Sequence, residues 1–133
     1  MDLLLRRPHR GDDRKKETMS TLKELTDVTL AFRHERNWKQ FHTAKDLALC
    51  LSLEAAEVVE LMQWRNGAAL DAHLAENKES LGDELSDVLH ALLLLAHDNG
   101  IDLGAAYVAK MRKNAVKYPV EKAKDRATKY TEL

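Results

Sequence analysis

The chain has 133 residues, and its 21 Lys and Arg nearly balance 22 Asp and Glu, for a formal charge of −1. This length fits one domain, and five Gly and two Pro are too few for an all-β protein, which needs frequent turns. A single cysteine, Cys50, excludes an internal disulfide, and no apolar run is long enough to span a membrane. We therefore expect a soluble, cytoplasmic, all-α protein.

The charges are distributed unevenly along the chain. Residues 1–18 mix both signs without any period, so we expect a disordered leader before a folded domain over residues 19–133. Seven basic and fifteen acidic residues give −8 over residues 19–109, whereas eight basic and three acidic residues give +5 over residues 110–133. This pattern lacks the continuous basic face of a nucleic-acid-binding protein, so we expect no nucleic acid polymer and no membrane as partner.

Helix-capping and helix-breaking residues divide the folded part of the chain. Thr21 and Thr43 each precede an acidic residue by three positions, which is the capping-box pattern, and Asp102 is a third N-cap candidate. Two Asn-Gly pairs and Pro119 are expected to end helices. The predicted elements are helices over 20–36, 43–64, 77–97 and 102–118, a loop over 37–42, an ambiguous loop with a short helical turn over 68–76, and a polar, partly helical tail. This order predicts a four-helix bundle.

Two acidic side chains interrupt the apolar faces of the second and third predicted helices. Glu54 lies in the middle of an apolar stripe on the second helix, and Glu84 lies in the middle of a stripe on the third. Each is followed three residues later, on the same side of its helix, by a second carboxylate, at Glu57 and Asp87. The two stripes consist of Leu47, Leu51, Val58 and Leu61, and of Leu81, Val88, Ala91 and Leu95.

Four carboxylates gathered on inward faces need a positive partner, because burying them unpaired is costly and they repel one another. Neither stripe contains Lys or Arg, so a divalent cation is the favoured partner, and oxygen ligands without cysteine favour Mg²⁺ or Mn²⁺. Mg²⁺ commonly takes phosphate oxygens as further ligands, which predicts a phosphorylated substrate. A solvated acidic face is the alternative. A di-iron site is disfavoured, because Asp87-x-x-His90 has no second acid-x-x-His motif beside it.

The second helix also carries small residues on a further face. A helix that is apolar on two sides is buried on two sides, which in a chain this short indicates a partner subunit. Burial by the chain's own first and fourth helices is the alternative. The face consists of Ala48, Ser52, Ala55 and Val59.

The two acidic pairs, Glu54-Ala-Ala-Glu57 and Glu84-Leu-Ser-Asp87, with 26 residues between them, resemble those of the MazG-like all-α nucleoside triphosphate pyrophosphohydrolases. Further segments resemble the dCTP pyrophosphatase branch of that family, and together they extend the resemblance over residues 22–133. These segments are 32–42 (FRHERNWKQFH), 60–64 (ELMQW), 110–119 (KMRKNAVKYP) and 129–133 (KYTEL).

The resemblance implies hydrolysis of a nucleoside triphosphate, dCTP or a modified dCTP, to the monophosphate and pyrophosphate. It implies that the four acids Glu54, Glu57, Glu84 and Asp87 hold Mg²⁺, with Mn²⁺ as a substitute, and that one of them orients a water for attack at the α-phosphate. Trp38, His42 and Trp64 match the family's nucleobase pocket. The implied phosphate contacts are Lys110 and Asn114, assisted by Lys117 and Tyr118.

The resemblance also implies a homotetramer or homodimer and a role in clearing surplus nucleotides. The alternative from another class is a catalytically idle helical oligomer that binds nucleotides or a protein partner as a regulatory module. Turnover of a nucleoside triphosphate distinguishes the two.

Overall fold

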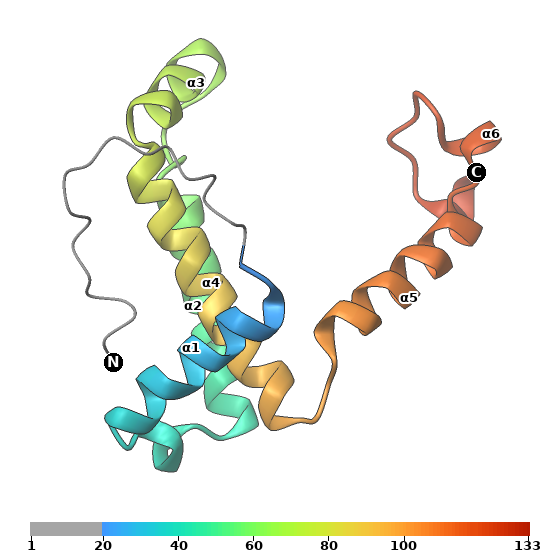
Figure 1. Ribbon diagram of the computed structural model, residues 1–133. Helices are drawn as coiled ribbons and strands as arrows, with labels where there is room; N and C mark the ends of the chain where they lie inside the picture. The colour runs from blue at the N-terminus through green and yellow to red at the C-terminus, as the bar shows by residue number, and fades with distance from the viewer. Residues whose placement is uncertain (1–19) are drawn as a thin grey trace, which may run out of the picture. The chain divides into compact units, whose positions relative to one another are not determined.

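The computed structural model describes residues 20–133, so the expected leader at 1–18 lies outside the described residues. The chain divides into two compact units, one ending at Asn99 and the other spanning Gly100–Leu133. Every regular element in the described part is helical (Figure 1). The elements are α1 (Leu22–Glu35), the 3₁₀ helix η1 (Trp38–Phe41), α2 (Ala44–Glu60), α3 (Gly67–Glu76), α4 (Lys78–Asp98), α5 (Leu103–Lys117), α6 (Val120–Ala123) and the 3₁₀ helix η2 (Tyr130–Glu132).

The capping signals start helices where the sequence indicates. The Thr21 hydroxyl accepts a hydrogen bond from the Glu24 N–H at 3.2 Å, and the Glu24 carboxylate accepts one from the Thr21 N–H at 2.7 Å. Thr43 forms the same reciprocal box at the start of α2. Asp102 caps α5 by accepting a hydrogen bond from the Ala105 N–H at 2.9 Å. These bonds satisfy amide groups that the first turn of a helix leaves unpaired.

The predicted number of four helices is wrong, because the described residues form six α-helices. The stretch predicted as a loop with a short turn is α3, whose sequence GAALDAHLAE is rich in strong helix formers. Gly67 begins it with φ of 53°, a left-handed conformation that glycine adopts without steric cost. The second helix also ends earlier than predicted, at Glu60 rather than Trp64, and the short helix α6 follows Pro119.

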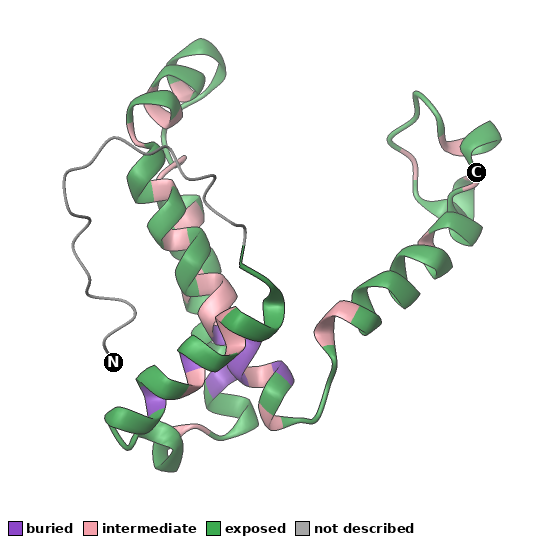
Figure 2. Ribbon diagram, in the orientation of Figure 1, coloured by how far each residue is buried: buried purple, intermediate pink, exposed green. Residues whose placement is uncertain are grey.

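The first unit is built on α2 and α4, which pack against each other, with α1 lying across α4 (Figure 1). Buried residues gather where α1 meets this pair (Figure 2). Elsewhere α2 keeps large apolar side chains in solvent, because Leu49, Leu53 and Val59 are each more than half exposed. The buried apolar side chains are Leu47, Ala91, Leu93, Leu94 and Ala96.

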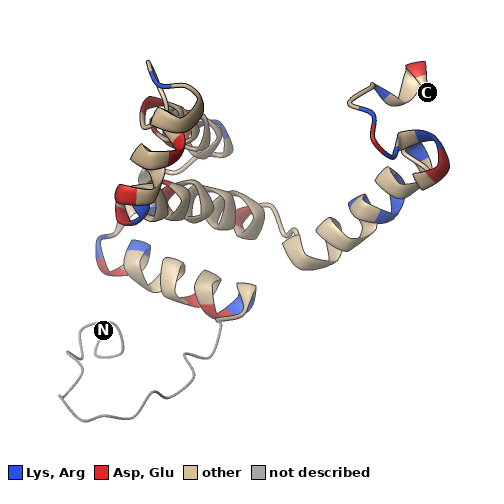
Figure 3. Ribbon diagram, turned by 90° about the horizontal axis from the view of Figure 1, so that it is seen from above, with Lys and Arg blue, Asp and Glu red and all other residues tan. Residues whose placement is uncertain are grey.

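The second unit consists of α5 and the segments that follow it. The Tyr118 and Tyr130 rings meet edge to face with centroids 5.9 Å apart, and the Lys117 ammonium lies 4.8 Å from the Tyr130 ring centroid. The tail therefore folds back onto the end of α5. Its Lys and Arg residues gather on the second half of α5 and the segment after it (Figure 3). No helix in the described range 20–133 is long and apolar enough to cross a membrane.

Candidate functional site

Three of the four predicted carboxylates converge between α2 and α4. One oxygen each from Glu54, Glu84 and Asp87 lies within 4.8 Å of the others. Glu54 and Glu84 are half-buried and Asp87 is exposed. Glu57 lies near enough to raise the pKa of both Glu54 and Glu84. The structure therefore brings together the side chains that the two interrupted apolar stripes indicated.

The electrostatics of this carboxylate cluster favour a positive ligand. Burial, and then the charges of Glu57 and Asp87, raise the pKa of Glu54. Hydrogen bonding with the Glu57 carboxyl group, followed by burial and the charges of the other acids, raises the pKa of Glu84. One buried Glu84 oxygen, Oε2, has no N–H or hydroxyl donor as a partner. A buried acceptor without a partner is destabilising, so this oxygen is suited to coordinate a cation.

The donor set fits a hard divalent cation. In residues 20–133, no Lys or Arg forms an ion pair with any of the four acids. The group of convergent ligand atoms in that range contains carboxylate oxygens and no histidine or cysteine, which suits Mg²⁺ or Mn²⁺ better than zinc. His90 is not among these convergent ligands in the described residues, and its ring contacts Phe32 edge to face at a centroid distance of 5.8 Å.

An aromatic cluster forms where α1, η1 and α4 meet. Phe32 contacts Trp38 edge to face, with ring centroids 5.9 Å apart, and the Arg36 guanidinium lies 3.6 Å from the Phe32 ring centroid. His42 follows η1, and its buried Nδ1 has no hydrogen-bond partner. Burial, and then the Arg33 charge, lower the pKa of His42, which favours the neutral ring. Flat apolar rings such as those of Phe32 and Trp38 can stack on a base.

The structure does not bring the remaining predicted substrate contacts into this cluster, and Trp64 is separated from Trp38 by the whole of α2, 17 residues or about 25 Å. Trp64 follows α2 with φ of 68°, an unusual backbone conformation for a bulky residue, and its side chain is 91% exposed. Lys110 and Asn114 lie one turn apart on α5 in the second unit. Lys117 is the last residue of that helix, and the Tyr118 N–H donates to the Asn114 carbonyl at 2.8 Å.

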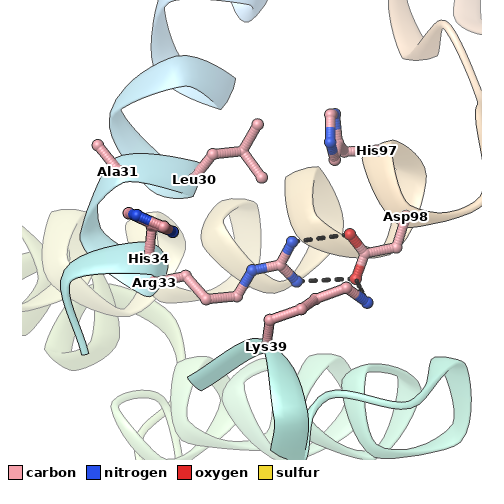
Figure 4. A pocket seen from close by; sticks show the side chains of 7 residues that line it. All are labelled: Leu30, Ala31, Arg33, His34, Lys39, His97 and Asp98. Atoms are coloured by element: carbon pink, nitrogen blue, oxygen red, sulfur yellow. Dashed lines mark hydrogen bonds and ion pairs between the residues drawn. The ribbon is translucent and has the colours of Figure 1, made fainter. Parts of the chain in front are cut away.

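A buried ion pair that sequence reasoning missed joins α1 to the end of α4 (Figure 4). The Arg33 guanidinium donates two hydrogen bonds to Asp98, at 2.7 and 2.8 Å, and these side chains are only 6% and 10% exposed. The Lys39 ammonium donates to the same carboxylate at 3.1 Å. The hydrogen bond from Arg33 is the main cause that lowers the pKa of Asp98 to about 2. An arginine following Leu25 and Thr29 at four-residue spacing was the available signal, because it places a cation on the inner face of the first helix.

This ion pair borders a pocket of about 470 Å³ on the first unit (Figure 4). The pocket is open to solvent and carries cationic and histidine side chains from α1, η1 and α4. Its lining residues are Leu30, Ala31, Arg33, His34, Lys39, His97 and Asp98.

The chain is similar to known proteins in sequence and in fold. The model of the MazG-like family matches residues 49–133. The chain is 39% identical over 115 residues to dCTP pyrophosphatase 1 of Rattus norvegicus and 36% identical over 115 residues to that of Homo sapiens; each match covers 85% of this chain and 68% of the relative. A crystal structure of a pyrophosphatase from Archaeoglobus fulgidus superposes with a TM-score of 0.71 at 34% identity, covering 80% of this chain and 99% of that one.

Proposed function

This chain belongs to the MazG-like family and is a nucleoside triphosphate pyrophosphohydrolase, and from this we propose that its substrate is dCTP or a modified dCTP. The products are the nucleoside monophosphate and pyrophosphate. The observation that carries the proposal is the carboxylate cluster of α2 and α4 with the unpartnered Glu84 oxygen, in a chain whose relatives are dCTP pyrophosphatases.

We assign the metal to Glu54, Glu57, Glu84 and Asp87, with Mg²⁺ as the cofactor and Mn²⁺ as a substitute. When bound, the cation neutralises phosphate charge and makes the α-phosphorus more electrophilic. A carboxylate of the cluster orients a water and accepts its proton as the water oxygen bonds to the α-phosphorus. The bond from that phosphorus to the bridging oxygen breaks, and pyrophosphate leaves.

Substrate recognition is assigned to groups outside the carboxylate cluster. Lys110, Asn114, Lys117 and Tyr118 contact the phosphates, which agrees with the basic character of residues 110–133. Trp38 stacks on the base and His42 lies at its edge, whereas Trp64, at the other end of the 17-residue helix α2, reaches a base only from another subunit of the proposed oligomer.

We propose a homotetramer or homodimer as the working assembly, located in the cytoplasm. The support is the apolar surface of the first unit, because large apolar side chains of α2 and α4 stay in solvent in the single chain. Exposed apolar patches of this kind are typical of protein interfaces. The side chains are Leu49, Leu53, Val59 and Leu85.

The function is tested by incubating the protein with each deoxynucleoside and ribonucleoside triphosphate in the presence of Mg²⁺. We expect pyrophosphate release to be fastest with dCTP or a cytosine-modified dCTP. Faster release with a purine nucleotide would overturn the assigned base. No release with any nucleotide would leave the catalytically idle oligomer as the better description.

Mg²⁺ is expected to raise the melting temperature of the native protein but not of a variant carrying Glu54→Gln, Glu57→Gln, Glu84→Gln and Asp87→Asn. A ligand present at a hundred times its Kd stabilises the folded state by about 2.7 kcal/mol. The shift should shrink from pH 7.5 to pH 5, because the raised pKa values of Glu54 and Glu84 let protons compete with the cation. Thermal unfolding with and without Mg²⁺ at both pH values measures this. Equal shifts in the two proteins would place the cation elsewhere.

Trp64→Ala is expected to raise KM for cytosine nucleotides more than KM for other nucleotides, with kcat little changed. The side chain is 91% exposed, so its removal should cost little stability, and base stacking is worth about 1–3 kcal/mol per base. Steady-state kinetics over the nucleotide panel measure the change. A uniform rise in KM for every base would argue against a role in base selection.

A further inference from the structure

The carboxylate of Asp98, the last residue of α4, accepts hydrogen bonds from positively charged side chains of two separate elements. Arg33 reaches it from α1 through two hydrogen bonds, and Lys39 reaches it from η1 through one (Figure 4). Asp98 therefore links three elements at one carboxylate. The mechanism proposed above uses none of these three side chains.

The Arg33–Asp98 pair is a fixed anchor for the lysine. Both side chains are at least nine-tenths buried, and the two parallel hydrogen bonds hold the carboxylate in one orientation. The Lys39 side chain is 61% exposed, and an isolated ion pair at such an exposed position contributes little free energy. Here the two hydrogen bonds from Arg33 already fix the Asp98 carboxylate. Only the Lys39 side chain therefore loses conformational entropy when the Lys39–Asp98 bond forms.

Lys39 connects that anchor to the predicted base-binding residues. Trp38 precedes it in η1, and the His42 N–H donates to the Lys39 carbonyl oxygen at 3.1 Å. The bond from Lys39 to Asp98 is the one side-chain hydrogen bond that runs from η1 to another helix within residues 20–133. Asn37, with φ of 52°, joins η1 to α1 and forms no side-chain cap. The contacts that orient η1 are the Lys39 bond, the ring contact of Trp38 with Phe32, and the Arg36 guanidinium 5.9 Å from the Trp38 ring centroid.

We propose that Lys39 is a positioning residue, whose ion pair with Asp98 sets η1 so that Trp38 and His42 meet the nucleobase. This rests on the proposed function, because it takes Trp38 and His42 as base contacts. Lys39 would then affect substrate affinity through the base contacts and not through the reacting phosphate. Loss of the bond should weaken base binding and leave the carboxylate cluster of α2 and α4 unchanged.

Lys39→Met removes the ammonium, keeps the apolar stem and leaves the Arg33–Asp98 pair in place. We expect KM for the preferred nucleotide to rise about three- to tenfold while kcat stays within about twofold, and Lys39→Arg to restore most of the affinity. Lys23→Met is the matched control, because Lys23 pairs with Asp27 at 2.8 Å on exposed α1 surface and carries the same charge. An unchanged KM, an equal rise in the control, or a fall in kcat alone would overturn the proposal.

Trp38 fluorescence tests the same inference without turnover. The chain has two tryptophans, so Trp64→Phe leaves Trp38 as the one indole emitter. In that background, Lys39→Met should shift the Trp38 emission maximum while Lys23→Met should not. Unchanged emission after loss of Lys39 would overturn the positioning role even in an active enzyme. An inactive native protein would refute the proposed function instead, and the emission shift would still report whether Lys39 sets η1.

Discussion

Glu84→Gln is expected to lower the rate of pyrophosphate release by at least about a hundredfold while leaving the protein folded. Glu84 supplies the buried oxygen of the cluster that has no hydrogen-bond partner, and an amide there cannot replace the charge that a hard cation requires. Glu54→Gln should have a comparable effect, because Glu54 is the other half-buried acid of the cluster. Pyrophosphate release at saturating dCTP and Mg²⁺ measures the loss.

The stability of the Glu84→Gln variant distinguishes a lost ligand from a lost fold. The neighbouring acids and burial raise the pKa of Glu84, so its charged form is disfavoured in the metal-free protein. Removing that charge should keep or increase the melting temperature without metal. Glu79→Gln is the matched control, since Glu79 is exposed in the first turn of α4 outside the cluster. Activity near that of the native protein in Glu84→Gln would show that the cluster does not hold the essential cation.

Asp98→Asn is expected to lower the free energy of unfolding by about 3 kcal/mol, because it leaves the buried Arg33 guanidinium without its counter-charge. The pKa of Asp98 is lowered to about 2, and this depression alone corresponds to about 2 kcal/mol. That contribution is fully present above the ordinary pKa of an aspartate and is lost as the pH falls through about 2. Thermal and urea unfolding at pH 7 measure the change, and a drop in Tm of about 10 °C or more is expected.

Two further variants show whether the instability of Asp98→Asn comes from the uncompensated charge of Arg33. Asp27→Asn, which breaks the exposed pair with Lys23, should change the free energy of unfolding by less than about 1 kcal/mol. The double variant Arg33→Met with Asp98→Leu should recover much of the stability that Asp98→Asn loses, because it removes both buried charges. A double variant as unstable as Asp98→Asn would mean that the pair contributes more than charge balance.

Local signals in the sequence predicted the starts of α1, α2 and α5 and the carboxylate cluster. Thr21, Thr43 and Asp102 cap helices through side chains and amides three residues apart, so the neighbouring sequence contains the whole interaction. The convergence of Glu54 and Glu84 followed from a similar rule, since a residue in the middle of an apolar stripe faces the packed helix.

The features that sequence reasoning missed depend on longer-range or weaker preferences. Arg33 meets Asp98 across 65 positions, and nothing in the spacing of either residue identifies the other as its partner. The helix α3 lacks a side-chain cap, so only its composition favoured a helix over the loop that was predicted. The 3₁₀ helix η1 was predicted as a loop because four residues are too few to show a period.

The sparse core of the first unit has a consequence for how its stability is measured. Few apolar side chains are buried in the single chain, and several large ones on α2 and α4 remain in solvent. In the proposed oligomer these side chains are covered by another copy, so folding and association share one equilibrium and follow mass action. The melting temperature then rises with protein concentration, and each variant must be compared with the native protein at the same subunit concentration.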